Sequence, residues 1–196
     1  MRKTRQAVSC GGAQRAGEGE LLAQLVEEYI REYRPGEDLE FRAYEVCESL
    51  REAIERAAMS LTSGIRHPHQ RRGFKLSTLE AARDALLKRE SEVASVSTFA
   101  ELHNLIAETI GPNRTRALYV YDVATRIGAK QNLWPQDVYL HAGTREGAKK
   151  LGFNVRGQRT LKISDLRSKI GTEIDRLQPY ELEDFICIFA DRISPR

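Results

Sequence analysis

Apolar residues recur every three or four positions through most of this chain, which is the spacing of one face of an α-helix. No segment shows a sustained alternation of apolar and polar residues with the period of two that marks a half-buried strand. The pattern therefore predicts an all-α fold, a compact bundle of about eight or nine helices. The main apolar stripes lie at residues 21–33, 47–61, 99–110, 166–177 and 182–189.

Local signals predict where several of these helices begin and end. The first stripe is closed by the turn residues at 34–36, Arg-Pro-Gly. Ser77 with Glu80, and Thr98 with Glu101, have the spacing of a capping box ahead of apolar-periodic runs. In such a box the two side chains accept hydrogen bonds from backbone amides in the first turn. We therefore expect helices to start near both pairs.

Length and composition favour one folded domain. A chain of 196 residues with 41% hydrophobic content can bury one good core. We expect a single helical domain over residues 18–196, which can divide into two lobes, 18–95 and 96–196. Residues 1–17 are rich in Gly, Arg, Gln and Ala and have no apolar period, so we expect a flexible basic N-terminal arm there.

The sequence favours a cytoplasmic protein without a membrane segment. No apolar run approaches the length of a bilayer span, and no apolar signal segment follows the first residues. Cys10, Cys47 and Cys187 are far apart and lack the paired spacing of metal ligands, so we expect reduced thiols. We expect no metal and no cofactor, and a protein that acts as a monomer.

Charge is distributed unevenly, although the net charge is only +3. Residues 18–56 hold 12 acids and 5 bases, residues 61–75 hold 4 bases and no acid, and residues 111–160 hold 9 bases and 3 acids. A basic middle is the electrostatic footprint expected of a surface that meets a polyanion. A solvated charged face is the simpler alternative.

The most concentrated group of basic and polar side chains lies at residues 64–72. It holds two imidazoles, an amide and three guanidiniums, and no acid. Guanidinium groups match phosphate oxygens and guanine edges, and His and Gln can orient a base, so a nucleic acid is the first partner to consider. The alternative is a cluster neutralised by acids elsewhere or solvated on a loop. The group consists of Arg66, His67, His69, Gln70, Arg71 and Arg72.

A second candidate segment lies at the centre of the chain, where one predicted helix ends at Gly111 and another begins soon after. A short turn of this kind exposes backbone amides at a helix N-terminus, which can bind a phosphate. Asn113, Arg114 and Arg116 would reinforce such a site. An ordinary helix connection with solvent-facing arginines is the alternative.

The helix that follows carries Asp122 among apolar neighbours. Asp is unfavourable inside a helix unless its side chain makes a specific interaction. It can pair with Arg126 at i+4, and that pair is one explanation. A carboxylate beside Tyr121 and a basic cleft is also what a cationic transition state requires. Downstream, we expect Tyr139 and His141 to be buried, and a satisfied core histidine is the alternative for His141.

These residues resemble the helix-hairpin-helix DNA glycosylases. The resemblance covers residues 98–152 and consists of the Gly-Pro turn, the helix with its Asp, and the Arg-Ile-Gly at 126–128. The spacer from Gly111 to Asp122 is shorter than that of the family, and no Schiff-base lysine precedes Asp122. The wider pattern, including the cluster at 64–72, is similar to bacterial phage-defence glycosylases that excise glucosylated hydroxymethylcytosine from viral DNA.

The resemblance implies a bilobal enzyme that binds modified phage DNA, removes a base and leaves an abasic site. It implies a monofunctional mechanism in which Asp122 stabilises the oxocarbenium-like sugar, with Tyr121 and His141 beside it. Tyr119 and Trp134 are further candidates for stacking on a flipped base. The implied substrate-binding residues are Arg66, His67, His69, Gln70 and Tyr139, and the implied DNA-binding residues are Arg71, Arg72, Gly111, Asn113, Arg114, Arg116, Arg126 and Lys149.

Two other classes of function stay open. The first is a non-catalytic nucleic-acid-binding protein in which Asp122 only braces Arg126. The second is a helical interaction protein that docks a partner on its acidic N-terminal helices. The acids at 181, 183 and 184 follow Pro179, so favourable charge in a first helical turn explains them better than a metal site does.

Overall fold

The computed structural model describes residues 11–62, 65–66, 74–111 and 117–193, with side chains for 19–61, 74–111 and 117–193. Within these ranges the chain forms ten α-helices, one 3₁₀-helix and two pairs of two-residue antiparallel strands. The predicted all-α fold is confirmed. The first half of the chain contributes α1 (Gly11–Glu32), α2 (Arg34–Glu45), α3 (Leu50–Ala58), β1 (Leu61–Thr62), β2 (Ile65–Arg66), α5 (Leu76–Lys88) and α6 (Glu90–Ser95).

The second half of the chain holds the elements that surround the candidate site described below. Strands β3 and β4 pair with Val138 opposite Leu161 and Tyr139 opposite Thr160. The elements are α7 (Phe99–Ile110), α8 (Ala117–Gln131), β3 (Val138–Tyr139), α9 (Ala142–Lys150), β4 (Thr160–Leu161), α10 (Ile163–Ile170), η2 (Glu173–Arg176) and α11 (Pro179–Ile193).

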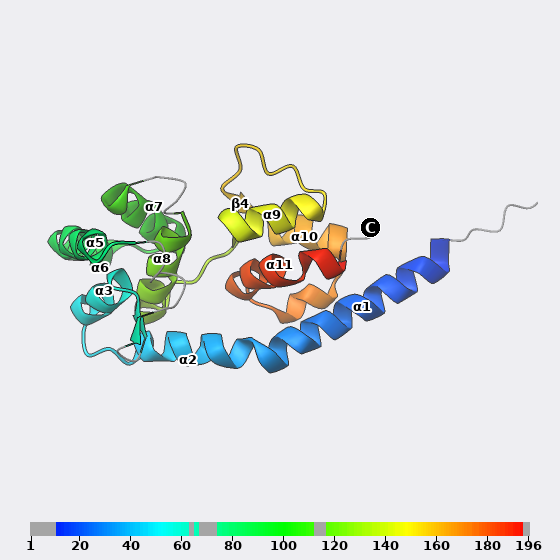
Figure 1. Ribbon diagram of the computed structural model, residues 1–196, viewed down its shortest axis with the longest axis horizontal. Coiled ribbons are helices and arrows are strands. Elements are labelled where there is room, and N and C mark those ends of the chain that lie inside the picture. The colour runs from blue at the N-terminus through cyan, green and yellow to red at the C-terminus, as the bar shows by residue number, and fades with distance from the viewer. Residues whose placement is uncertain (1–10, 63–64, 67–73, 112–116, 194–196) are drawn as a thin grey trace, which may run out of the picture.

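Two separate hydrophobic cores divide the molecule into two lobes. The first core lies among α2, α3 and α5 to α8, and the second among α1, β3, β4 and α9 to α11. In Figure 1 the two groups of helices lie side by side, and α1 and α2 run beneath both. The expected boundary between residues 95 and 96 is therefore wrong. Leu25, Val26 and Tyr29 of α1 are fully buried in the second core, so long-range packing joins the first helix to the last ones.

The N-terminal helices also differ from expectation. Residues 11–17, which we assigned to a flexible arm, lie in α1, while residues 1–10 lie outside the described part of the chain. The first helix ends at Glu32, next to the predicted turn, but Arg34 to Gly36 form the first turn of α2 and not a loop. Pro35 occupies the first turn of α2, where its missing amide hydrogen costs no intrahelical hydrogen bond.

One predicted capping box is present and the other is not. Thr98 accepts a hydrogen bond from the Glu101 amide at 3.2 Å, and the Glu101 carboxylate accepts one from the Thr98 amide at 3.0 Å. The helix expected near Ser77 begins one residue earlier, at Leu76, with Lys75 as its N-cap and no capping side chain. Ser77 therefore lies inside the first turn, too late to act as the cap.

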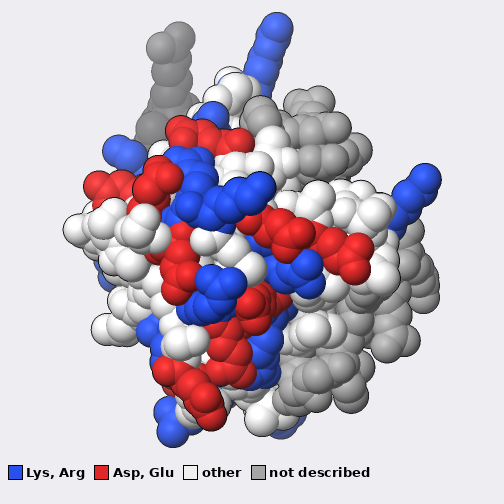
Figure 2. Space-filling model, turned by 90° about the vertical axis from the view of Figure 1, so that its left-hand side faces the viewer, with Lys and Arg blue, Asp and Glu red and all other residues white. Residues whose placement is uncertain are grey.

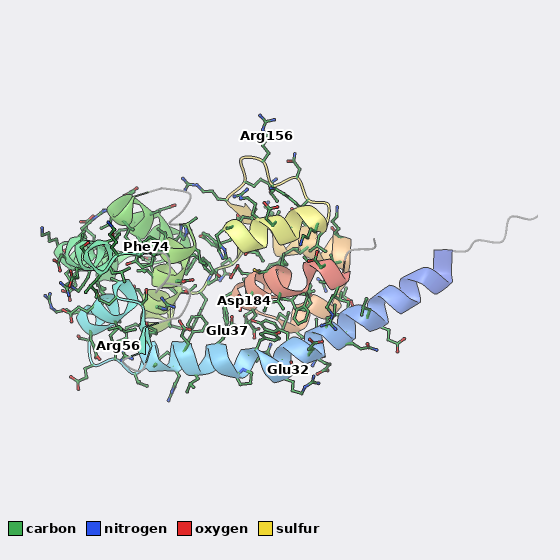
Figure 3. All side chains as sticks on the ribbon, in the orientation of Figure 1. Glu32, Glu37, Arg56, Phe74, Arg156 and Asp184 are labelled. Carbon is green, nitrogen blue, oxygen red and sulfur yellow. The ribbon has the colours of Figure 1, made fainter. Side chains whose placement is uncertain are left out.

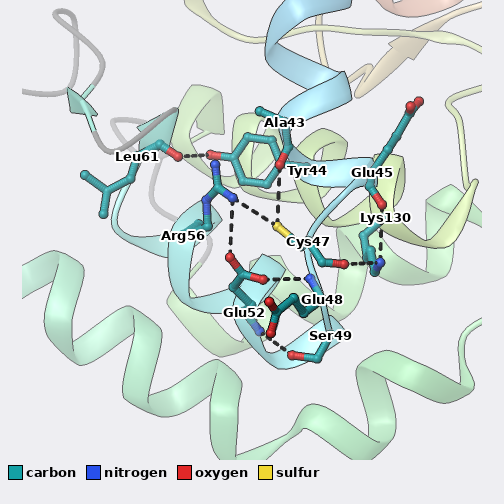
Figure 4. Close-up of polar contacts among 10 residues, drawn as sticks. All are labelled: Ala43, Tyr44, Glu45, Cys47, Glu48, Ser49, Glu52, Arg56, Leu61 and Lys130. Carbon is teal, nitrogen blue, oxygen red and sulfur yellow. Dashed lines mark hydrogen bonds and ion pairs between the residues drawn. The ribbon is translucent and has the colours of Figure 1, made fainter.

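The corner between α2 and α3 is tied to α8 by polar contacts, as Figure 4 shows. Lys130 of α8 donates to the carbonyl of Cys47 at 2.5 Å and to that of Glu45 at 3.2 Å. The Ser49 hydroxyl caps α3 by accepting from the Glu52 amide at 3.1 Å. The two Lys130 contacts fix the end of α2 against α8, the helix that carries Tyr121 and Asp122.

Close packing of α9 against α11 brings together residues that are far apart in the sequence. A Cβ atom on Gly147 would lie 2.5 Å from the backbone oxygen of Ile186, and one on Gly143 would collide with the sulfur of Cys187. Glycine at both positions lets the two backbones approach each other. As a result, the start of α9 lies directly against the first turns of α11.

Candidate functional site

A cavity of 580 Å³ lies where the α7–α8 hairpin meets β3 and α9. Helices α7 and α8 pack against each other in the first lobe, whereas α9 and β4 belong to the second. The cavity therefore lies between the lobes. Its lining combines aromatic side chains with basic ones: His103, Tyr121, Tyr139, His141, Arg145, Lys149 and Arg159 are among them.

Four rings form a continuous aromatic wall. The ring centroids of His103 and Tyr139 are 4.5 Å apart, those of Tyr139 and Tyr121 are 5.5 Å apart, and those of Tyr121 and His141 are 5.4 Å apart. Burial lowers the pKa of His103 to about 4, with a smaller contribution from the charge of Arg159, so this imidazole is neutral at physiological pH. The rings of His103, Tyr139 and Tyr121 thus offer flat, uncharged surfaces on which another ring can stack.

The last ring of this wall, His141, belongs to a buried acid–base pair. Nε2 of His141, the N-cap residue of α9, is 2.5 Å from a carboxylate oxygen of Glu183 on α11, and the Thr144 hydroxyl donates to the same oxygen. Burial alone lowers the pKa of His141, but the hydrogen bond and charge of Glu183 outweigh burial and raise it above its ordinary value. The pair therefore favours a protonated imidazole.

Two buried polar atoms of cavity-lining residues lack a hydrogen-bond partner within the described residues. They are the hydroxyl of Tyr121 and Nδ1 of His141, in side chains that are 5% and 6% exposed. A buried polar group without a partner costs roughly 1–3 kcal/mol, so such groups usually meet water or a ligand. Adjacent rings that present two such atoms are suited to bind a polar ligand.

Asp122 lies next to Tyr121 in α8, but its side chain does not line the cavity. Burial raises its pKa, opposed by the positive charges of Arg126 and His141. The Arg126 guanidinium is 3% exposed, and its Nε donates to Glu40 of α2 at 2.7 Å. The prediction that Arg126 contacts DNA is therefore wrong, because the side chain is enclosed between helices and occupied by an acid.

More carboxylates join α2 to α11 between the lobes. Figure 3 shows Glu37 and Asp184 lying close together there. Burial, followed by the charge of Asp184, raises the pKa of Glu37 to about 9. Glu181 accepts two hydrogen bonds from Arg34, at 2.5 and 2.9 Å, and a third from the Gln178 amide at 2.6 Å. Among the described residues, no group of three or more His, Cys, Asp or Glu side chains forms a metal site.

The residues predicted from sequence are brought together only in part. Tyr121, Tyr139, His141, Gly111 and Lys149 all line the cavity, and Lys149 forms an ion pair with Glu146 at 2.6 Å. Several others lie outside the described residues: the side chain of Arg66, and His67, His69, Gln70, Arg71, Arg72, Asn113, Arg114 and Arg116.

The two further stacking candidates lie elsewhere. The Tyr119 hydroxyl donates to the carbonyl of Ala58 at 2.6 Å in the first core. The Trp134 ring packs on Phe41 and Tyr180, with centroid distances of 5.3 and 5.1 Å. Neither residue lines the cavity.

Sequence reasoning missed His103, Arg145, Arg159 and the partner role of Glu183. His103 lies on an amphipathic helix where nothing in the local pattern distinguishes it. Glu183 has the position of a favourable first-turn acid, which is how we interpreted it. Only the packing of α9 on α11 brings it to His141.

A contrasting surface lies on the opposite side of the first lobe, where acidic and basic side chains alternate, as the face in Figure 2 shows. Ion pairs there include Arg51 with Glu90 at 3.0 Å, and Arg89 with Glu92 at 2.7 Å. Because each sign of charge is neutralised locally, this face has little attraction for a polyanion.

Comparisons of the chain with protein-family models, with curated proteins and with solved structures find no match. Among the helices of the described ranges, none combines the length and the apolar character needed to cross a membrane.

Proposed function

We propose that this protein is a monofunctional DNA glycosylase that takes a modified base into the interlobe cavity and leaves an abasic site. The observation that carries the proposal is the combination found in one cavity: an aromatic wall, two buried polar atoms without a described protein partner, and several cations. A flipped base has lost both stacking and pairing, and a pocket must replace them. Rings replace the stacking, and Tyr121 and His141 can bind the polar edge of the base.

The size of the cavity supports a base with a substituent. Its 580 Å³ lies within the roughly 300–1,000 Å³ typical of small-molecule pockets. An unmodified pyrimidine would fill only part of that space. The proposed substrate is therefore a bulky modified base in phage DNA, and glucosylated hydroxymethylcytosine has suitable size and hydroxyl groups.

The surroundings of the cavity suit the path of a DNA backbone. Gly111 at the end of α7 lines one side, and Arg145, Lys149 and Arg159 line the other. Cations on a cavity rim attract phosphates, which remain outside when the base enters. In this proposal the hairpin and the second lobe hold the two flanks of the flipped nucleotide.

The proposed reaction is hydrolysis of the N-glycosidic bond. As that bond breaks, its electron pair leaves with the base and C1′ of the sugar becomes oxocarbenium-like. Water then adds its oxygen to C1′. His141, kept protonated by Glu183, donates a proton to the leaving base and regains one from the attacking water. Asp122 contributes negative charge from behind Tyr121, which favours the cationic sugar and the protonated imidazole.

A lysine-based lyase reaction is not part of the proposal. Lys149 is the lysine that lines the cavity among the described residues, and its ammonium group forms an ion pair with Glu146 at 2.6 Å. An ammonium group has no lone pair with which to attack C1′. Borohydride treatment during turnover should therefore trap no covalent complex with DNA.

Abasic-site formation tests the proposal. Purified protein is incubated with duplexes that carry cytosine, hydroxymethylcytosine or its glucoside, and alkali then cleaves any abasic sites. We expect cleavage only after the modified bases. His141→Gln should lower the rate about 10²-fold or more, as removal of a general acid does. Asp122→Asn should lower it and shift the pH at which activity is lost, because Asp122 acts through the charge of His141.

A non-catalytic nucleic-acid-binding protein is the second candidate. It is favoured by the position of Asp122, whose side chain faces the charge of Arg126 and does not line the cavity. This alternative predicts tight binding to modified duplexes and no alkali-sensitive site at any pH. That result would exclude the excision reaction and retain the cavity as a base-binding site.

A further inference from the structure

The segment from Arg145 to Lys169 carries positive charge that the described part of the fold does not neutralise. It contains eight lysines and arginines and two acids. Three of these cations have acid partners: Lys149 pairs with Glu146, Lys150 with Asp191, and Arg167 with Asp175. The other five form no ion pair with a described residue: Arg145, Arg156, Arg159, Lys162 and Lys169.

Arg145 holds the connection between α9 and β4 in a fixed shape. Its guanidinium donates to the carbonyls of Val155 at 2.5 Å, Gln158 at 2.8 Å and Leu140 at 3.2 Å. All three acceptors are neutral, so the contacts fix the loop without cancelling the charge. Lys169 adds a hydrogen bond to the Gly152 carbonyl at 2.8 Å from the other end of the loop.

The remaining three cations of this group are exposed along the loop and the start of α10. Figure 3 shows Arg156 at the tip of the loop, with its side chain pointing away from the body of the protein. Arg159 donates to the Asn104 side chain at 3.2 Å, a neutral partner on α7, and also lines the cavity. Lys162 is the exposed N-cap residue of α10 and makes no side-chain cap contact.

We propose that Arg156, Arg159 and Lys162, which we call the basic strap, bind the sugar-phosphate backbone of a nucleic acid beside the cavity. The strap lies on the second lobe, across the cavity from the α7–α8 hairpin. This proposal depends on the nucleic-acid partner of the proposed function and is independent of the excision chemistry. A polyanion is favoured because the cations are arranged along an ordered loop, have no acid partner among the described residues and reach from the loop tip to the cavity rim.

The experiment compares two triple variants by binding to a fluorescein-labelled, unmodified duplex of about 20 base pairs over a salt series. The strap variant is Arg156→Gln, Arg159→Gln and Lys162→Gln. The control variant is Arg42→Gln, Arg51→Gln and Arg83→Gln, which removes the same charge from exposed cations that pair with Glu45, Glu90 and Asp84.

We expect the strap variant to bind about tenfold more weakly or worse, with a salt dependence reduced by about 2–3 in log–log slope, since each lost phosphate contact removes about 0.9. The control should keep the wild-type slope. Equal losses in both variants, or none in either, would overturn the proposal. Circular dichroism melting of both variants, compared with that of the wild type, checks that they are folded.

Two further arms separate the remaining outcomes. In the first arm, the wild type and the strap variant are tested on vesicles of phosphatidylcholine and phosphatidylserine. If the vesicles bind the wild type as tightly as the duplex does, and the strap substitutions weaken both interactions equally, the surface binds lipid and the proposal is wrong. A wild type that binds the duplex through the strap but excises no base supports the strap and excludes the glycosylase. A wild type that binds no duplex overturns both.

Discussion

The wall of the interlobe cavity and the charged surface of the first lobe in Figure 2, which we call the α3–α5–α6 face, use charge in opposite ways. The face has many exposed ion pairs, whereas the wall and the helices behind it hold a few ionisable groups that are buried and have shifted pKa values. Exposed pairs contribute little stability because water and salt screen them. Buried ones are strongly coupled to their surroundings. Burial, and not the number of charges, therefore determines how strongly a charged group is coupled to its surroundings.

The largest difference is expected from breaking one pair in each region. Glu183→Ala should lower the free energy of unfolding by about 2–3 kcal/mol, somewhat less than the 3–5 typical of broken buried pairs, because His141 can release its proton. Glu90→Ala, which breaks the exposed pair with Arg51, should cost under about 1 kcal/mol. Urea denaturation of both variants measures the two values. Equal costs would show that burial does not distinguish the regions.

The close approach of α9 and α11 should be the next most sensitive feature. Gly147→Ala places a methyl group 2.5 Å from the Ile186 carbonyl oxygen, so the helices must separate. We expect a loss of about 1–3 kcal/mol, as for other overpacked sites. Gly36→Ala is the matched control, because a Cβ atom there meets nothing within 4 Å. Thermal melting distinguishes them, and a Gly147→Ala protein as stable as the control would refute the tight packing.

The pH dependence of stability should follow the buried acids. The folded pKa of Glu37 is raised from 4.5 to about 9, and that of His141 is raised above 6.5. Both groups bind protons more tightly when folded, so their stabilisation is present below the unfolded pKa and is lost as pH rises through the folded pKa. Each group can contribute a slope of up to about 1.4 kcal/mol per pH unit.

Glu37→Gln tests this dependence. The variant should flatten the loss of stability between pH 7 and 9, measured by urea denaturation at each pH. His103 contributes with the opposite sign below pH 6.5, because its folded pKa is lowered to about 4, so the alkaline range is the informative one. Glu108→Gln, on an exposed side chain, serves as control. An unchanged slope in Glu37→Gln would show that this carboxyl does not bind its proton in the folded state.

The smallest effect is expected from the α3–α5–α6 face. Arg83→Gln removes an exposed pair with Asp84 and should change stability by under about 0.5 kcal/mol and excision not at all. A measurable loss of excision activity would show that this face also takes part in binding DNA. Rate assays with the modified duplex check the point.

Local sequence signals predicted much of the helical framework and part of the site. The capping box of Thr98 and Glu101 and the apolar stripe of α7 needed only near neighbours, and both are present. Tyr121, Tyr139 and His141 were selected from unusual local context, and all three line the cavity. We expected Asp122 to face the same space, but its side chain does not line the cavity. Tyr121 and Asp122 are neighbours in α8. Which of their side chains lines the cavity depends on the elements that pack against this helix, and the local sequence does not contain that information.

The sequence by itself determined the helical class, because i, i+3 and i+4 apolar spacing and capping act within a few residues. Only the tertiary structure decided that α1 packs in the second lobe, that Gly147 lets α9 approach α11, and that His141 therefore meets Glu183. The sequence shows the cations of the basic strap, but only the structure shows that none of them pairs with an acid in the described part of the chain. Ion pairing, burial and cavity shape depend on contacts between distant segments, and a local pattern carries no information about which distant segments meet.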